Sequence, residues 1–298
     1  MMKEQKTIQL AMCGALLANV IFGFSFLFTK LALNAASPVL LLAYRFTFAF
    51  LLMSLIAFFN PKLLRLKGKP LKNVILMGVC QPLLYFVCEN YGMLYSSTTF
   101  AAVIIALVPI GAMLLGMVAL KERCSFRQIL CCVISVGGVI WLAVKNESEG
   151  HVTFFGIVLL AGAVLSASGF NVLSRKNAAD FSAFERTYVM FTMAMVVFDF
   201  WALFETSGNV GALLSPLKDT GFLTSVLYLG GASSVGAFLM YNAATTYLPI
   251  ARAAAFSSVI TVVSLFAGVV FLNESFDVVS LVASGIIILG IWGVQKNS

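Results

Sequence analysis

Two stretches of this chain, Gly116-Met-Val-Ala-Leu-Lys-Glu122 and Gly268-Val-Val-Phe-Leu-Asn-Glu274, share a glycine, an apolar run and a closing glutamate. They lie 152 residues apart, and the same offset relates residues on both sides of each stretch without a gap. The further pairs are Gly78/Gly230, Asn90/Asn242, Tyr95/Tyr247, Ala101/Ala253, Ala102/Ala254, Ile134/Ile286 and Gly138/Gly290. The chain is therefore predicted to contain one structural unit twice.

The composition is typical of a helical membrane protein. The 298 residues are 61% apolar and 10% charged, with a mean hydropathy of +1.00, which excludes an ordinary soluble domain. The net charge of +7 does not indicate nucleic-acid binding, because the basic residues gather in particular loops between apolar segments. We therefore expect the lipid bilayer as a partner and no nucleic acid.

The apolar segments are long enough to cross a bilayer, which takes about 20 residues per helix. Two long uncharged runs, 90–120 and 220–251, each break at a polar or proline-containing point, and these breaks occupy equivalent positions in the two units. The predicted spans are 8–33, 38–60, 71–94, 98–119, 124–144, 152–174, 183–205, 219–247, 251–272 and 277–295.

The distribution of basic residues predicts the orientation. With the N-terminus in the cytoplasm, 15 of the 19 Lys and Arg residues fall on the cytoplasmic side, and only Lys145 and Lys218 fall outside. Five helices per unit is an odd number, so the second unit starts on the opposite side. We predict an all-α integral membrane fold of ten transmembrane helices, arranged as two inverted five-helix repeats over 1–147 and 148–298. Both termini are predicted to be cytoplasmic, and inverted repeats are typical of transporters.

The third predicted span carries the strongest candidates for a substrate site. Gln81, Tyr85 and Glu89 are spaced four residues apart and so share one helix face, with Asn90 beside them. A charge within a span is costly, which marks Glu89 for attention. Two interpretations stay open. Glu89 either forms an ion pair with Lys30 or Arg45 that holds helices together, or it faces a cavity and binds a cationic group or a proton.

The second unit does not copy this site. The equivalents of Gln81, Tyr85 and Glu89 are Ser233, Ala237 and Tyr241, so the polar face persists and the charge is lost. We therefore expect one asymmetric site between the units, with Tyr241 and Asn242 as further candidates. Asn90 and Asn242 make either substrate contacts or hydrogen bonds between helices.

Other polar residues have less direct interpretations. Asp199 is a second acid within a span and a weaker candidate for coupling, and Pro109 is expected to kink its helix. Glu122 and Glu274 end apolar helices, which favours capping of the helix that follows or closing of the turn. The sequence has one histidine, His151, and no metal-binding spacing, nucleotide-binding loop or nucleophile motif, so we expect no metal, no cofactor and no enzymatic activity.

These features together resemble the drug/metabolite transporter superfamily, specifically its ten-helix EamA-like members. The resemblance covers nearly the whole chain, and its most specific parts are the repeated segments and the stretch Tyr247-Leu-Pro-Ile-Ala251. The family's usual Trp-Gly in the first helix is Phe22-Gly23 here. The resemblance implies a central cavity between inverted halves and alternating access for small metabolites, often amino acids exported from the bacterial cytoplasm.

The sequence therefore predicts a secondary or facilitated transporter in the plasma (inner) membrane. Its expected substrate is a small polar metabolite, an amino acid or related amine, with export as the expected direction and the proton as a candidate coupling ion. The alternative is an importer of a quaternary amine such as choline, for which an acid within an aromatic pocket is suited.

Overall fold

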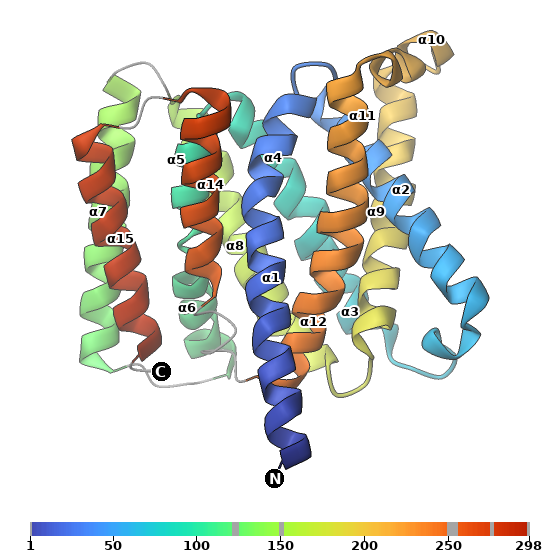
Figure 1. The fold of residues 1–298 in the computed structure, drawn as a ribbon, viewed down its shortest axis with the longest axis horizontal. Helices are drawn as coiled ribbons and strands as arrows, with labels where there is room; N and C mark the ends of the chain where they lie inside the picture. Colours follow the sequence, from blue (N-terminus) through green and yellow to red (C-terminus); the bar gives the residue numbers. More distant parts are fainter. Residues whose placement is uncertain (1, 121–124, 149–151, 249–255, 275–276, 297–298) are drawn as a thin grey trace.

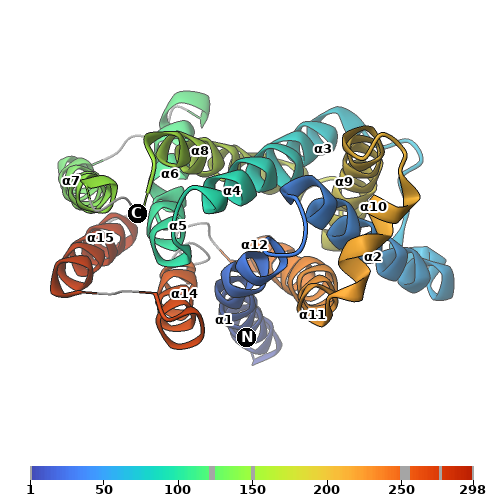
Figure 2. The ribbon, with the colours of Figure 1, turned by 90° about the horizontal axis from the view of Figure 1, so that it is seen from above.

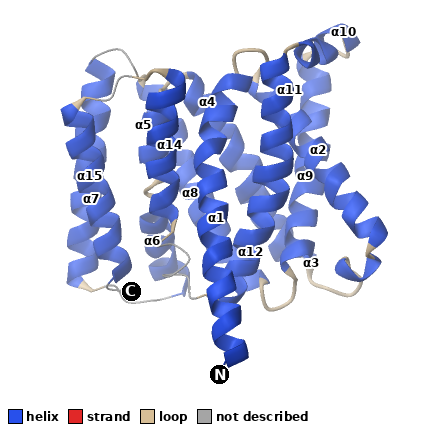
Figure 3. Ribbon diagram, viewed as in Figure 1, coloured by secondary structure: helices blue, strands red, loops and turns tan. Residues whose placement is uncertain are grey.

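The computed structural model describes residues 2–120, 125–148, 152–248, 256–274 and 277–296, and these residues form helices and short connections with no strand (Figure 3). The helices run side by side along one direction, and both ends of the chain lie at the same, lower end in Figure 1. Below, "upper end" and "lower end" refer to this view.

The first half of the chain contains helices close to the predicted spans. They are α1 (Met2–Ala32), α2 (Pro38–Phe59), α3 (Leu71–Gly78), a π-helical segment η2 (Val79–Leu84), α4 (Tyr85–Leu94), α5 (Thr98–Ile105), α6 (Val108–Leu120) and α7 (Phe126–Ser148), with a short 3₁₀ turn η1 (Pro61–Leu63) after α2. The span predicted over 98–119 is interrupted at Ala106 and Leu107, just before Pro109, whose ring cannot take part in a continuous helix.

The second half follows the same sequence of elements. They are α8 (Phe154–Asn177), α9 (Ala183–Glu205), α10 (Val210–Leu214), a 3₁₀ turn η3 (Ser215–Lys218), α11 (Thr220–Leu227), a π-helical segment η4 (Tyr228–Ala237), α12 (Phe238–Tyr247), α14 (Ser257–Leu272) and α15 (Val278–Lys296). The π-helical segments η2 and η4 overlap when the 152-residue offset is applied.

Several helices are long and apolar enough to cross a bilayer. Within the described residues there are seven such helical stretches, together with shorter apolar helices over Phe126–Leu142, Val259–Leu272 and Val278–Gly293. The seven are Thr7–Ala32, Pro38–Phe59, Leu71–Leu94, Thr98–Leu115, Phe154–Asn177, Ala183–Glu205 and Thr220–Tyr247. The chain is accordingly a multi-pass helical membrane protein.

Local sequence signals explain where helices start. Ser37 caps α2, with Pro38 at the first helical position, and Ser97 caps α5. Ser182 and Glu185 form a capping box at the start of α9, in which each side chain accepts a backbone N–H of the other residue. Each cap satisfies amide groups that would otherwise have no partner at a helix end.

Helices distant in sequence pack in pairs. At one side of the molecule α7 packs against α15, and at the opposite side α2 packs against α9 (Figure 2). In the middle, α1 contacts α12 and α14, while α8 contacts α4 and α6. Glycines allow the closest approaches: a Cβ at Gly230 would lie 3.0 Å from the backbone oxygen of Arg45.

Glu274 performs the capping role expected of it on a different helix. Its carboxylate accepts the backbone N–H groups of Thr98 (2.7 Å) and Thr99 (2.8 Å), at the start of α5 in the other half of the chain. The helix that follows Glu274, α15, is capped instead by Asp277, which accepts Ser280 N–H at 2.9 Å. A hydrogen bond from Lys145 holds the pKa of Asp277 below its usual range. Glu122 lies outside the described residues.

We expect Glu274→Ala to destabilise the protein by about 1 kcal/mol, because two amides at the start of α5 lose their acceptor. The measurement is thermal unfolding of the purified protein in detergent. Glu205→Ala is the matched control, because the Glu205 carboxylate accepts a solvent-exposed hydroxyl, that of Ser37. Equal stability of the two variants would contradict the capping role.

Candidate functional site

A carboxylate and a tyrosine meet in the interior of the helical bundle. The Tyr85 hydroxyl donates to Glu89 Oε1 at 2.7 Å, across one turn of α4. Only 6% of Glu89 is exposed, and Tyr85 is buried as well. A buried carboxylate needs hydrogen-bond donors, and the Tyr85 hydroxyl supplies one to Glu89 from the same helix face.

Arg45 lies beside this pair and is 1% exposed. Its Nε donates to Ser234 Oγ at 2.9 Å and its Nη2 donates to Ser233 Oγ at 3.2 Å, so that α2 is joined to η4. The guanidinium carbon lies 4.2 Å from the centre of the Phe86 ring. We call Arg45, Tyr85, Glu89, Ser233 and Ser234 the central polar cluster.

The cations expected near Glu89 have other direct partners. Lys30 donates to the carbonyl oxygens of Met93 (2.9 Å) and Ser96 (3.1 Å), at the end of α4, where carbonyls lack helical partners. Among the described residues no Lys or Arg nitrogen comes within the 4.0 Å of an ion pair with Glu89. Arg45 and Glu89 therefore do not form an ion pair with each other.

Gln81 marks an interruption of the helix that leads to the cluster. Its backbone is extended (φ −146°, ψ 122°) inside η2, and Pro82 follows it. The equivalent segment, η4, supplies Ser233 and Ser234 to Arg45. Local π-helical geometry is frequent at functional sites because it changes the direction of side chains on an otherwise regular helix.

The two equivalent asparagines have different surroundings. Asn90 is 0% exposed, and neither its Nδ2 nor its Oδ1 has a hydrogen-bond partner among the described residues. Asn242 donates to Thr187 Oγ1 (3.0 Å) and accepts from Ser174 Oγ (3.2 Å). These partners lie at the end of α8 and the start of α9, so Asn242 belongs to the lower end and lies apart from the central polar cluster.

Tyr241 lies on an aromatic wall that continues towards the cluster. Its hydroxyl donates to Asn171 Oδ1 at 3.4 Å, and its ring meets the edge of Phe22 at 6.2 Å between centroids. Phe22 packs against Phe238 at 5.1 Å, and Phe238 packs against Phe86 at 6.4 Å. Aromatic rings thus connect Tyr241 with the ring over which Arg45 lies.

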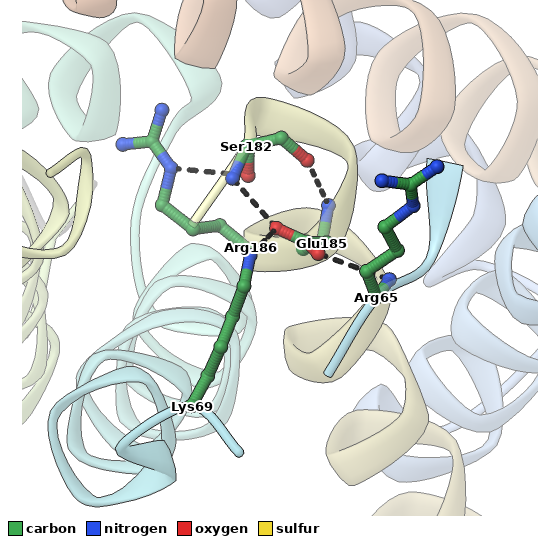
Figure 4. Close-up of polar contacts among 5 residues, drawn as sticks. All are labelled: Arg65, Lys69, Ser182, Glu185 and Arg186. Carbon is green, nitrogen blue, oxygen red and sulfur yellow. Dashed lines mark hydrogen bonds and ion pairs between the residues drawn. The ribbon is translucent and has the colours of Figure 1, made fainter. Parts of the chain in front are cut away.

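A second charged cluster occupies the lower end and holds the two halves together. Glu185 accepts from Lys69 Nζ (2.6 Å), from the Arg65 backbone N–H (3.0 Å) and from the Ser182 N–H (2.8 Å), as Figure 4 shows. The adjacent Arg186 donates through Nη1 to Ser174 and through Nη2 to the Asn242 carbonyl oxygen and Thr246. The charged side chains of Lys69, Glu185 and Arg186 all have close partners here, as expected of a structural contact.

Asp199, the other acid within a span, also has a close partner. Thr47 Oγ1 lies 2.7 Å and 2.8 Å from its two carboxylate oxygens, and the pair joins α2 to α9. Among the described residues no group of three or more His, Cys, Asp or Glu side chains is arranged to hold a metal ion.

The sequence did not predict that serines of η4 accept hydrogen bonds from Arg45. Arg45 was identified as a charge within a span, and Ser233 as the equivalent of Gln81. The contact between them was not predicted, because a repeat offset relates equivalent positions and does not tell which helices touch. The sequence signal that could have indicated this contact is the pair of adjacent serines, Ser233 and Ser234, within an apolar helix.

A multi-pass helical bundle with interrupted helices and a polar cluster between distant segments has the architecture of a membrane transporter. Comparison with known proteins agrees. The chain belongs to the EamA-like transporter family, whose sequence profile matches residues 9–144 and 154–295.

Relatives of this chain are also named as transporters. "Uncharacterized transporter YcxC" of Bacillus subtilis is 33% identical over 300 residues, covering 100% of this chain and 96% of the relative. The "Probable terminal-alkyne amino-acid exporter" of Streptantibioticus cattleyicolor is 24% identical over 242 residues, covering 78% of this chain and 76% of the relative. A crystal structure at 17% identity superposes with a TM-score of 0.70 and covers 96% of both chains, which supports the fold.

Asn90 and Asn242 allow a matched test of how a buried asparagine side chain changes the free energy of unfolding. Asn90→Leu removes buried polar atoms that have no described partner, so we expect it to stabilise the protein by about 1 kcal/mol. Asn242→Leu breaks the bonds to Thr187 and Ser174, and we expect destabilisation of about the same size. Thermal unfolding in detergent measures both. If Asn90→Leu destabilises as much as Asn242→Leu, the amide of Asn90 is satisfied inside the protein.

Proposed function

We propose that the protein moves a small polar metabolite, an amino acid or related amine, across the plasma membrane by alternating access, with export as the direction. The observation that carries the proposal is the central polar cluster. It contains a buried acid and a buried cation, and it joins α2 and α4 of the first half to the π-helical segment η4 of the second half. A buried ionisable group of this kind in a membrane protein marks a substrate or ion path.

The proposed architecture is ten transmembrane helices in two inverted five-helix repeats, over 1–147 and 148–298. The helix pairing supports it. Two contacts, α2 with α9 and α7 with α15, join equivalent helices. Exchange of the halves converts the contact of α4 with α8 into that of α12 with α1, and the contact of α6 with α8 into that of α14 with α1. The two matched ranges of the family profile add support.

Both termini are proposed to be cytoplasmic, which makes the lower end the inner side. The basic loop between α2 and α3 and the basic end of α8 lie at that end together with the two termini (Figure 1). This concentration of Lys and Arg is what the positive-inside rule requires of a cytoplasmic face.

Contacts between the halves lie at both ends of the molecule, an arrangement that is suited to alternating access. At the upper end the Glu274 carboxylate holds the start of α5, and at the lower end Glu185 holds Lys69 and the Arg65 amide. Arg45 and Glu89 are buried between them. Release of one contact while the other persists would open the cluster to one side at a time.

In this proposal Glu89 binds the ammonium group of the substrate or a coupling proton, and Tyr85 orients its carboxylate. Gln81, Asn90 and Tyr241 contribute polar contacts. The network of Asn242 with Thr187 and Ser174 favours a role between helices for that residue. An amino-acid substrate is supported by the printed function of the Streptantibioticus relative.

The second candidate is import of a quaternary amine. The rings of Phe22, Phe238 and Tyr241 lie together near an acid-bearing helix, and aromatic faces attract quaternary ammonium groups.

Counterflow in proteoliposomes tests the proposal. With the purified protein and a labelled panel of amino acids, amines and choline, we expect accumulation of at least one amino acid. Accumulation of choline alone would favour the second candidate, and accumulation of no compound would contradict both.

We expect Glu89→Gln to abolish this counterflow and to leave the yield of folded protein intact, because the amide keeps the shape and an acceptor for Tyr85 but carries no charge. Glu205→Gln, at the exposed upper end of α9, is the control and should transport normally. Normal transport by Glu89→Gln would contradict a role of the Glu89 charge in binding.

A further inference from the structure

Two arginines among the described residues, Arg45 and Arg186, are fully buried, and their hydrogen-bond partners differ. Arg186 is 0% exposed, and all three of its nitrogens donate: Nη1 to Ser174, Nη2 to Asn242 and Thr246, and Nε to the Ser182 carbonyl oxygen at 3.5 Å. Three of these acceptors are backbone carbonyl oxygens near helix ends, which carry partial negative charge. All three guanidinium nitrogens of Arg186 therefore have hydrogen-bond acceptors within the protein, without any ligand.

Arg45 is equally buried and is not satisfied. Two neutral serine hydroxyls take Nε and Nη2, and Nη1 makes no hydrogen bond with any residue that the structure describes. No carboxylate among the described residues comes within 4.0 Å of it, and the nearest acid on the adjacent helix, Glu89, is bonded to Tyr85. A guanidinium without a paired anion is costly in the interior of a membrane protein, so the arrangement is complete only when an anionic group is added.

The free part of Arg45 has a defined shape. Ser233 and Ser234 hold the Nε–Nη2 side of the planar group, and the Phe86 ring lies 4.2 Å from its carbon. The edge formed by Nη1 and Nη2 therefore remains for a ligand, and two parallel N–H donors on such an edge match the two oxygens of a carboxylate.

We infer that Arg45 binds the carboxylate of the substrate, so that the carrier selects zwitterionic amino acids over amines that lack a carboxylate. This inference rests on the proposed transport function and adds to Glu89 the group that recognises the other end of the substrate. The ligand is neutral overall: its carboxylate compensates Arg45 and its ammonium compensates Glu89. Since Arg45 lies in the first half and its serine partners in the second, the bound carboxylate lies where the halves meet.

Competition in counterflow separates carboxylate recognition from ammonium recognition. The probes are L-leucine, L-phenylalanine and L-threonine, each compared with its carboxamide, which keeps the side chain and the ammonium group. Isopentylamine and phenethylamine lack the carboxyl carbon altogether. For amino acids that the protein transports, we expect the carboxamide to compete at least about tenfold more weakly, as for the loss of one charge-assisted bidentate contact.

Substitutions then test whether Arg45 is the group responsible. Arg45→Gln should remove the preference for the amino acid over its carboxamide, and Arg45→Lys, which keeps the charge without the planar fork, should retain part of it. Arg186→Gln is the matched control: it should reduce the thermal midpoint and leave the preference unchanged. If Arg45→Gln does not fold, Arg45→Lys decides the question, since an unchanged preference in that variant would contradict recognition by the planar fork of Arg45.

The outcomes distinguish the inference from the function on which it rests. Carboxamides and amines that compete as well as the amino acids would overturn the role of Arg45 while transport stands, and so would an unchanged preference in Arg45→Gln. If no amino acid, carboxamide or amine is transported, the proposed substrate class and the role of Arg45 both fail.

Discussion

In a bilayer every backbone and charged group must find its partner inside the protein, and this requirement organises the structure around the points where helices are interrupted. A regular helix satisfies its own backbone. At η2, at η4 and between α5 and α6 that regularity is lost, and polar side chains gather there. Ser168 donates to the Val108 carbonyl oxygen at 3.1 Å beside one interruption, and Ser233 and Ser234 face Arg45 from another. The interruptions thus create the polar interior that a carrier needs.

Much of the secondary structure could be predicted because its signals are local. The predicted spans 38–60 and 183–205 match Pro38–Phe59 and Ala183–Glu205 closely, since a serine cap precedes each helix and an apolar run fills it. The contacts of charged side chains were harder to predict from the sequence. Lys30 binds carbonyl oxygens at the end of α4, and Glu274 caps α5, because both respond to unsatisfied helix ends that lie far away in sequence.

The repeat explains why one half carries the charge. Equivalent positions hold Glu89 in one half and Tyr241 in the other, and the equivalent asparagines are unsatisfied in one case and fully bonded in the other. Two copies of a buried acid would double the cost of desolvation without adding a second substrate path. One acid in one half limits that cost to a single cluster.

The contacts that join the two halves use the same chemistry at both ends: a carboxylate bound to backbone amides and an ion pair. At the upper end the Glu274 carboxylate binds two backbone amides of α5, and Lys145 of α7 pairs with Asp277, which precedes α15. At the lower end Glu185 adds an ion pair with Lys69, whose side chain is 28% exposed, to its backbone contacts. Water and salt weaken an exposed ion pair more than a hydrogen bond to a helix end. The ion pairs at both ends, Lys145 with Asp277 and Lys69 with Glu185, are therefore expected to be more sensitive to salt than the backbone contacts beside them.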